Sequence, residues 1–283
     1  MTTILACIDA SLYATSIVEH AAWAAARLNG RIEVLHVIQR KDAIAARHDL
    51  SGAVGLGARS ALLEELVQID ESEGKLAQEK GRALLAAAKS HLEVLGQSNL
   101  TLTHRHGGIV ETIIEREEAA DLVIIGKRGA SADFAKGHLG SKVERVVRQS
   151  IRPVLVASRA YIEPKVIMLA FDGGSSSRKA LGFVATSPLF AGLTLHVVMA
   201  GREDQMHATH LNWARELLAV REDAHVTIID GKPEEIIASQ IAATGAGMLV
   251  MGAYGHSPLR TMIVGSTTTE MVRSCNIPVL LFR

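Results

Sequence analysis

The stretch Gly252–Arg283, GAYGHSPLRTMIVGSTTTEMVRSCNIPVLLFR, carries the pattern from which the fold can be predicted. The apolar run Met248–Met251 precedes it, and a Pro-Val pair followed by a second apolar run ends it. Between these runs lie Gly252, Gly255 and then Gly265-Ser266, which opens an amphipathic segment. This order predicts a strand, a glycine loop, a helix and a second strand.

Two interpretations of this stretch are open on its residues alone. Gly252 and Gly255 would let the backbone approach a ligand without a Cβ in the way. A helix that begins at Gly265-Ser266 would offer free N–H groups, its positive dipole end and the hydroxyls of residues 266–269 to a phosphate. Equally, the glycines could form only a tight turn and Ser266 only a helix cap, because short glycine motifs are weakly specific.

Composition limits the class of protein. The 283 residues predict two domains of ordinary size. Lys plus Arg (30) balance Asp plus Glu (30) and aromatic content is 4%, so we expect no nucleic-acid partner. No apolar run approaches the roughly 20 residues of a membrane span. The start, MTTILACIDAS, does not resemble a signal peptide, so we expect a cytoplasmic protein without a membrane partner.

The cysteines and histidines do not indicate a metal or disulfide site. Cys7 and Cys275 each lie in or beside an apolar run and are expected to be buried reduced thiols. The twelve histidines are scattered, and the close pairs His104/His106 and His207/His210 have no grouped carboxylates or cysteines around them. We therefore predict no metal site made of protein ligands.

Apolar strand-like runs alternate with helical runs along the chain, which predicts a parallel sheet covered on both faces. Between the second and third strands, residues 41 to about 96 are rich in alanine and charge and predict one or two helices with a mobile loop near 51–57. The expected strands are Thr3–Ile8, Ile32–Ile38, Leu100–His104, Leu122–Ile125, Pro153–Val156, Val166–Phe171, Leu193–Val198, Val226–Ile229, Met248–Met251 and Pro278–Phe282.

Markers in the first part of the chain recur in the same order in the second. Four pairs lie between 123 and 126 residues apart: Gly108 and Gly231, Gly126 and Gly252, Gly140 and Gly265, and Pro153 and Pro278. Asp9 and Asp172 lie 163 apart, so one insertion of about forty residues separates the second and third strands of the first part. Leu-His-Val occurs in both second strands, at 35–37 and 195–197. We predict a tandem duplication with domains 1–160, carrying a helical insert at about 41–96, and 165–283.

Both parts resemble the universal stress protein family, whose signature is G-x2-G-x9-G-[ST]. Gly252, Gly255, Gly265 and Ser266 match it without a gap, and the resemblance covers the chain except roughly residues 41–96. It implies an α/β fold of two Rossmann-like (adenine nucleotide alpha hydrolase-like) domains. Each would be a five-stranded, mainly parallel sheet with helices on both faces, and the last strands, Pro153–Ala157 and Pro278–Phe282, would join them as a pseudo-dimer.

The resemblance also implies a nucleotide site in each domain. The first-strand aspartate and the second-strand backbone would hold the nucleoside, and the glycine loop and Gly-Ser helix start would hold ribose and phosphates. The preferred site comprises Asp172, Val197, Gly252, Gly255, Gly265 and Ser266. The other comprises Asp9, Val37, Gly126, Gly129, Gly140 and Ser141, with ten residues instead of nine between Gly129 and Gly140.

Some nearby residues have simpler interpretations. Asp9 could instead cap the helix expected from Leu12. Lys127, Arg128 and Lys136 in the first part and Arg260 in the second could screen phosphate charge or be merely solvated. Trp23 and Trp213 are expected in the core or an interface.

The implied function is regulatory binding of ATP or AMP in the stress response, with Mg²⁺ through the phosphates and a further homodimer both left open. We expect no catalytic residue and at most slow ATP hydrolysis. One alternative is a slow ATPase or adenylyl-transfer enzyme, for which His138 and His256 are the candidate groups. The other is a nucleotide-free interaction scaffold, which the insert at 41–96 favours.

Overall fold

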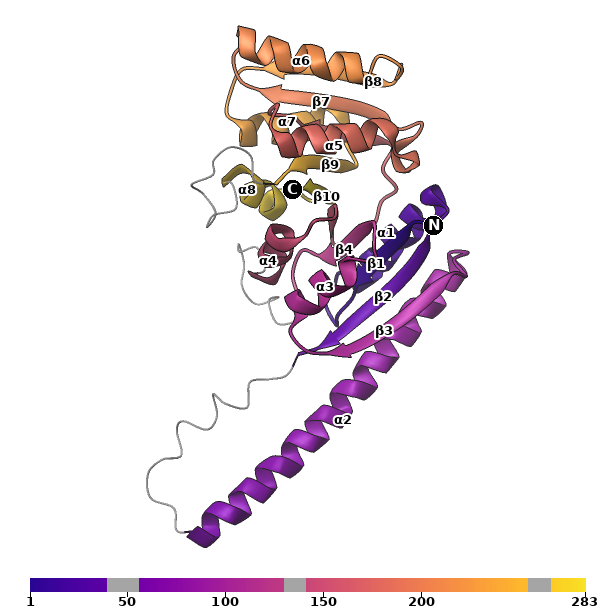
Figure 1. Ribbon diagram of the computed structural model, residues 1–283, viewed down its shortest axis with the longest axis vertical. Coiled ribbons are helices and arrows are strands. Elements are labelled where there is room, and N and C mark those ends of the chain that lie inside the picture. Colours follow the sequence, from indigo (N-terminus) through magenta and orange to yellow (C-terminus); the bar gives the residue numbers. More distant parts are fainter. Residues whose placement is uncertain (40–55, 130–140, 254–265) are drawn as a thin grey trace.

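The structure, a computed structural model, describes residues 1–39, 56–129, 141–253 and 266–283. The predicted alternation of strands and helices is confirmed in both halves of the chain (Figure 1). The first half contains β1 (Thr3–Cys7), α1 (Ala14–Leu28), β2 (Arg31–Ile38), α2 (Leu56–Val94), β3 (Leu100–His106), α3 (Ile109–Glu117), β4 (Leu122–Gly126), α4 (Ser141–Gln149) and β5 (Val154–Ala157). The second half contains β6 (Val166–Ala170), α5 (Ser175–Thr186), the 3-10 turn η3 (Pro188–Phe190), β7 (Thr194–Ala200), α6 (Gln205–Leu217), β8 (Ala224–Ile229), α7 (Pro233–Thr244), β9 (Met248–Gly252), α8 (Ser266–Ser274) and β10 (Val279–Phe282).

The strands form one ten-stranded sheet in the order β3-β2-β1-β4-β5-β10-β9-β6-β7-β8. All pairs within a half are parallel, and the two halves have the same strand order. At the centre β5 and β10 pair antiparallel, with Leu155 opposite Leu280. The expectation that the last strands join the halves is therefore confirmed. We call this pairing the seam.

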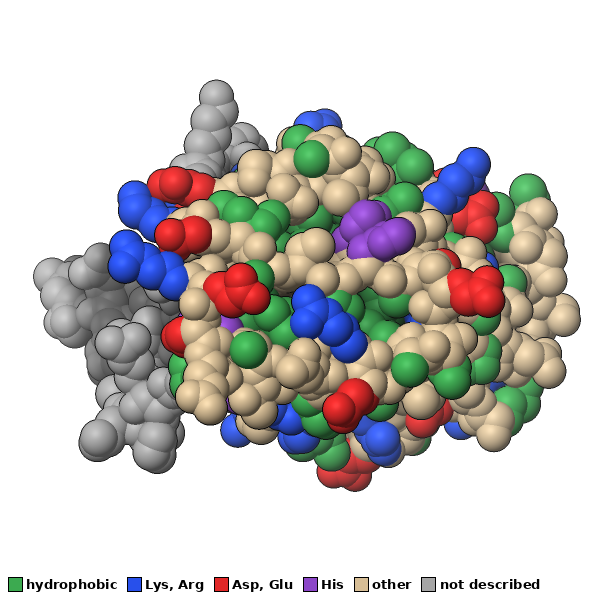
Figure 2. Space-filling model, turned by 90° about the horizontal axis from the view of Figure 1, so that it is seen from above, with side chains coloured by type: hydrophobic (Ala, Val, Ile, Leu, Met, Phe, Trp, Pro, Cys, Tyr) green, Lys and Arg blue, Asp and Glu red, His purple; other side chains and the backbone are tan. Residues whose placement is uncertain are grey.

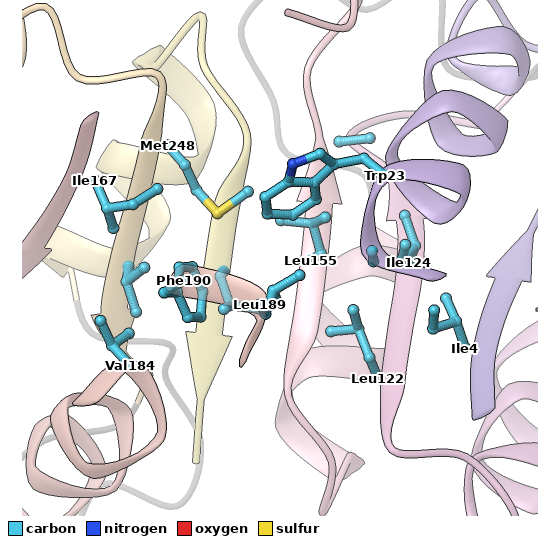
Figure 3. Close-up of a cluster of buried hydrophobic side chains, with 14 of the residues drawn as sticks. Ile4, Trp23, Leu122, Ile124, Leu155, Ile167, Val184, Leu189, Phe190 and Met248 are labelled. Carbon is cyan, nitrogen blue, oxygen red and sulfur yellow. The ribbon is translucent and has the colours of Figure 1, made fainter. Parts of the chain in front are cut away.

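Helices cover both faces of the sheet, as expected for buried parallel strands. Residues of α1, α2, α5 and α6 pack into one hydrophobic layer, and residues of α3, α4, α7 and α8 pack into the other. The first layer continues across the seam, where Trp23 of α1, Leu155 of β5 and Leu189 of η3 lie close together (Figure 3). Trp23 is buried and Trp213 is partly buried against the same layer, so both belong to the core as predicted.

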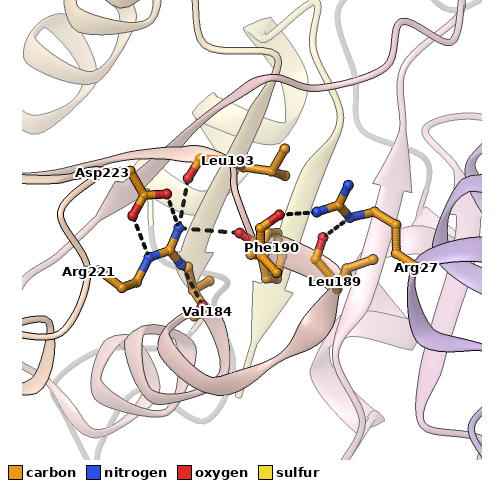
Figure 4. A network of polar contacts seen from close by, with 8 residues as sticks. Arg27, Val184, Leu189, Phe190, Leu193, Arg221 and Asp223 are labelled. Carbon is orange, nitrogen blue, oxygen red and sulfur yellow. Dashed lines mark hydrogen bonds and ion pairs between the residues drawn. The ribbon is translucent and has the colours of Figure 1, made fainter.

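Polar contacts also cross the seam. Arg27 of α1 donates from Nε to the carbonyl oxygen of Leu189 at 2.6 Å, and its Nη2 donates to the carbonyl of Ala191 (Figure 4). On the other side of η3, Arg221 donates to the carbonyls of Val184, Phe190 and Leu193 and pairs with Asp223. These charge-assisted bonds hold η3 between the two halves. Neither arginine was predicted from the sequence to have this role.

The insert forms one long helix in the part that the structure describes. α2 extends away from the sheet over its N-terminal part, and Leu85, Ala88 and Leu92 near its other end are buried against the body (Figure 1). The loop predicted near 51–57 falls mainly on residues 40–55, outside the described residues. Among the described residues, no helix is long and apolar enough to span a membrane.

Candidate functional site

A cavity of about 450 Å³ opens at the carboxyl ends of β1, β2 and β4. Because β1 lies between β2 and β4, this is the point at which the strand order reverses, where open α/β sheets bind ligands. The cavity brings together Asp9, Val37, Gly126, Gly129 and Ser141. The sixth residue predicted for this site, Gly140, lies outside the described residues.

The walls of the cavity are mostly apolar, with a few polar groups. Ile8, Leu84, Ile109, Ile113 and Val143 are among the apolar residues that line it. The polar residues of the lining include Asp9 and three cations, Lys80 of α2, Arg128 of the glycine loop and Lys142 of α4. An apolar chamber with one carboxylate and several cations can accept an uncharged ring and an anionic group together.

Asp9 follows β1 and does not cap α1. Its Oδ1 accepts a hydrogen bond from the Ser11 N–H at 3.0 Å, which closes a turn. The helix begins at Ala14, and its N-cap residue Tyr13 has no side-chain cap. A Cβ added at Gly129 would lie 3.0 Å from Asp9 Oδ2, so glycine there leaves room around the carboxylate. The capping interpretation of Asp9 is therefore wrong.

The cations beside the cavity differ in their partners. The buried Arg128 Nε has no hydrogen-bond partner among the described residues, which is unusual for a buried polar atom. Lys142 Nζ donates to Gln39 Oε1 at 2.7 Å, at the end of β2. Lys127 instead crosses the seam and donates to the Cys275 carbonyl at 2.9 Å, and burial lowers its pKa. Lys127, which was considered as a group that screens phosphate charge, is not among the residues that line the cavity, and Lys136 lies outside the described residues.

The two thiols are free, as predicted, but each is partly exposed rather than buried. Cys7 lines the cavity, where burial raises the pKa of its thiol far above the ordinary value and the charges of Glu33 and Glu117 raise it further. Burial also raises the pKa of the Cys275 thiol. Both side chains are therefore neutral at ordinary pH, and neither has the thiolate character of a nucleophile.

The second predicted site is described only in part. Gly255 and Gly265 lie outside the described residues, as does the side chain of Ser266, the first residue of α8. Asp172 accepts hydrogen bonds from the Gly174 N–H at 2.9 Å and from Ser177 Oγ at 2.5 Å, so it holds the start of α5.

Gly252 and Gly126 each allow close packing at the end of a strand. A Cβ at Gly252 would lie 2.8 Å from the backbone nitrogen of Ser177, and one at Gly126 would lie 2.8 Å from Tyr13 Cβ. In both halves the glycine thus allows the first helix to lie directly against the strand end.

The strand register corrects the position carried over as Val197. Cys7 of β1 pairs with Leu35, and Ala170, 163 residues later, pairs with Val198. The counterpart of Val37 is therefore Ala200, whereas Val197 is fully buried in the core. The shared tripeptide Leu-His-Val misled the sequence comparison, because its copies are 160 residues apart and the strands are offset by 163.

The turn after Asp172 is occupied by side chains from α5 and α6. Arg178 donates to the Gly173 carbonyl at 2.8 Å, contacts His210 Nδ1 at 2.8 Å and lies 4.4 Å from the centre of the Trp213 ring. Gly173 has φ of +75°, and a Cβ there would meet the His210 ring. The contacts of Arg178 with His210 and Trp213 were not predicted from the sequence.

The described residues contain no group of three or more His, Cys, Asp or Glu side chains that could hold a metal ion. The candidate enzyme residues His138 and His256 lie outside the described residues.

Comparisons with known proteins agree with this architecture. The model of the universal stress protein family matches residues 1–158 and 164–283. The universal stress protein Slr1230 of Synechocystis sp. is 36% identical over 287 residues, with both chains covered completely. A universal stress protein from Archaeoglobus fulgidus DSM 4304 superposes with a TM-score of 0.74 at 22% identity, covering 99% of this chain and 98% of its own. A putative universal stress protein from Pseudomonas aeruginosa UCBPP-PA14 superposes with a TM-score of 0.63 at 19% identity, covering 100% and 93%.

Proposed function

Because the chain belongs to the universal stress protein family, we propose that it binds an adenine nucleotide, ATP or AMP, in the cavity of its first half. The observation that carries this proposal is the unpaired Arg128 Nε in the wall of an apolar cavity that also contains Asp9. Nε of this half-buried guanidinium has no hydrogen-bond partner in the part of the chain that the structure describes, and a phosphate would supply one.

Different residues of the cavity would contact the nucleoside and the phosphates of such a ligand. The apolar wall and the backbone at Val37 would take the nucleoside, and the acceptor-only carboxylate of Asp9 suits a ribose hydroxyl. Arg128, Lys142 and the start of α4 at Ser141 would take the phosphates, since a helix N-terminus favours an anion. Mg²⁺, if present, would arrive with the phosphates.

The proposed role is regulatory rather than catalytic, in the cytoplasm and in the response to stress. The second site, at Asp172 and the glycine loop Gly252–Ser266, remains a prediction. The domain limits 1–160 and 165–283 and a further homodimer are likewise proposals. A slow ATPase would be distinguished by turnover that survives purification and depends on His256.

Calorimetric titration of the full chain with ATP and with AMP tests the proposal. We expect binding that weakens about tenfold or more in Arg128→Met, because a charge-assisted contact contributes roughly 1.5–3 kcal/mol. Arg202→Met is the matched control, since Arg202 is exposed and lies in the second half. The absence of binding heat, or equal affinities in Arg128→Met and the native chain, would refute the site.

A nucleotide-free scaffold is the second candidate, favoured by the length of α2 and its extension away from the sheet. Mass spectrometry of the denatured protein separates the two functions. Released adenine nucleotide supports binding. Nucleotide-free protein without a thermal shift in ATP supports the scaffold.

A further inference from the structure

α2 contacts a pair of histidine side chains at a single glycine, Gly81. His36 of β2 and His104 of β3 are paired in register, with ring centroids 5.2 Å apart. Gly81 of α2 is buried over them, and a Cβ there would lie 2.4 Å from His104 Nε2 and 2.9 Å from His36 Nδ1. Only a glycine lets the helix come this close, so the two rings form the seat of α2.

The nitrogens that face Gly81 are unsatisfied. His36 Nδ1 and His104 Nε2 are both buried without a hydrogen-bond partner among the described residues. Buried polar atoms are ordinarily hydrogen-bonded, and each exception requires an explanation. Two exceptions that point at the same glycine indicate that the seat is stable only while both rings are uncharged.

The second half shows that the fold does not require histidines at this place. Its strand pairing puts Met199 at the position of His36 and Ile228 at the position of His104, and these two residues are also paired in register. Met199 is buried in the core, and Ile228 packs against it. The same strand positions thus hold an apolar pair in one half and a titratable pair in the other.

The seat of α2 is also a wall of the cavity. Ala77, Lys80 and Leu84 flank Gly81 on α2 and line the cavity, as does His36 itself. A movement of α2 away from the sheet would therefore open the cavity on the side of β2.

We propose that protonation of the His36–His104 pair lifts α2 from the sheet and opens this wall, so that the cavity releases its ligand in acid. The release of nucleotide rests on the proposed function, whereas the movement of the helix does not.

The surrounding charges decide the pH at which the His36–His104 pair is protonated. Burial lowers the pKa of His36 and the nearby His104 lowers it further, whereas Asp9 at the end of β1 raises it. Burial also lowers the pKa of His104, and His106 of β3 and Arg82 of α2 lower it further. Lys80 of α2 adds a further positive charge at the cavity. Apart from Asp9, these charged neighbours oppose protonation of the seated pair.

The sign of the effect follows from these shifts. Once α2 has moved away from the sheet, the exposed rings regain pKa values near 6.5. They then bind protons that they do not bind while α2 is packed on them. The seat is therefore fully stable above about pH 6.5 and weakens as the pH falls below it, by at most tenfold per pH unit for each proton.

Hydrogen exchange of the full chain without ligand tests the helix movement. Between pH 7.5 and 5.5, after correction for chemical exchange, we expect protection of amides 77–92 to fall about tenfold or more. His36→Met/His104→Ile, which copies the second half, should remove the fall. His36→Gln/His104→Gln provides a second non-titrating pair if the first variant folds poorly. An equal fall in native and variant chains, or no fall in the native chain, would overturn the proposal.

ATP titrations at the same two pH values test the consequence for the cavity. The native chain should lose affinity severalfold more than the double variant, and protonation of ATP itself cancels in this comparison. His225→Val is the control, because His225 lies on the edge strand β8, is exposed and stacks on His196. Histidine side chains are visible together on the face of the molecule shown in Figure 2. The His225→Val variant should keep the native pH dependence. If ATP binds at neither pH, the proposed function fails, and the exchange experiment still decides whether the histidine pair moves α2.

Discussion

The turn after β1 and the turn after β6 both begin with an aspartate, but the two aspartates have different surroundings. Asp9 lies in the wall of a cavity, beside a glycine that leaves it room. Asp172 accepts hydrogen bonds from the backbone and side chain at the start of α5, and Arg178 and His210 occupy the adjacent turn. The same backbone position thus faces a potential ligand in one half and fixes a helix in the other.

A second pair of equivalent positions shows the same divergence inside the sheet. Glu33 of β2 is buried, forms a two-point ion pair with Arg116 at 2.8 and 2.9 Å, and accepts from Thr103 at 2.8 Å. The register places His196 at this position in the second half, where it stacks on His225. The halves therefore share a backbone while their buried polar groups have been replaced.

The largest effect is expected from breaking the ion pair between Glu33 and Arg116. Arg116→Met leaves the Glu33 carboxylate, whose side chain is 8% exposed, without its cation. We expect a loss of roughly 3 kcal/mol in the free energy of unfolding, measured in urea. Arg145→Met, which breaks the exposed pair with Glu111, should cost at most about 1 kcal/mol. Similar losses in the two variants would show that Glu33 is not effectively buried.

The next effect tests the glycine that the two halves share. Gly252→Ala would place a Cβ 2.8 Å from the Ser177 backbone nitrogen, so α5 must shift, and we expect a loss of about 1–3 kcal/mol. Gly182→Ala in the same helix meets nothing within 4 Å and should stabilise the chain by up to about 1 kcal/mol. Thermal unfolding should therefore shift in opposite directions. A shift in the same direction would contradict the packing role of Gly252.

A smaller effect separates the two aspartates. Asp172→Ala removes the bonds to Gly174 and Ser177, and we expect it to cost roughly 1–2 kcal/mol in unfolding free energy. Asp9→Ala should cost less stability but weaken ATP binding in calorimetry. If Asp172→Ala weakens ATP binding and Asp9→Ala does not, the nucleotide site must be assigned to the second half instead of the first.

The smallest effect concerns the contact of Lys127 across the seam. The register makes Ala253 the counterpart of Lys127, so Lys127→Ala makes the halves alike at this position. The loss of one hydrogen bond to the Cys275 carbonyl should cost about 1 kcal/mol. ATP affinity should stay within about twofold of native, because the amine points away from the cavity. A large loss of affinity would place Lys127 at the phosphates after all.

Much of the fold could be predicted because buried parallel strands are continuous apolar segments, and helices such as α1 and α7 end beside a glycine. The seam followed from the family resemblance, and the five described residues of the first site do converge. The register between the second strands of the two halves was predicted wrongly. The shared tripeptide Leu-His-Val was aligned in place of the 163-residue offset of the strands, which put Val197 in the position of Ala200. The direction of Lys127 and the contact of Gly81 with two imidazoles depend on neighbours distant in sequence, which no local pattern reports.

The seam between β5 and β10 has a further consequence because both strands belong to one chain. Two separate copies would dissociate on dilution, whereas tethered halves meet at an effective concentration fixed by the linker. The surfaces through which the two halves meet also need not be self-complementary. The contact of Arg27 with η3, for example, joins two different surfaces, so no symmetric copy of it constrains the residues that form it. Covalent fusion therefore permits each half to change its own cavity without loss of the assembly.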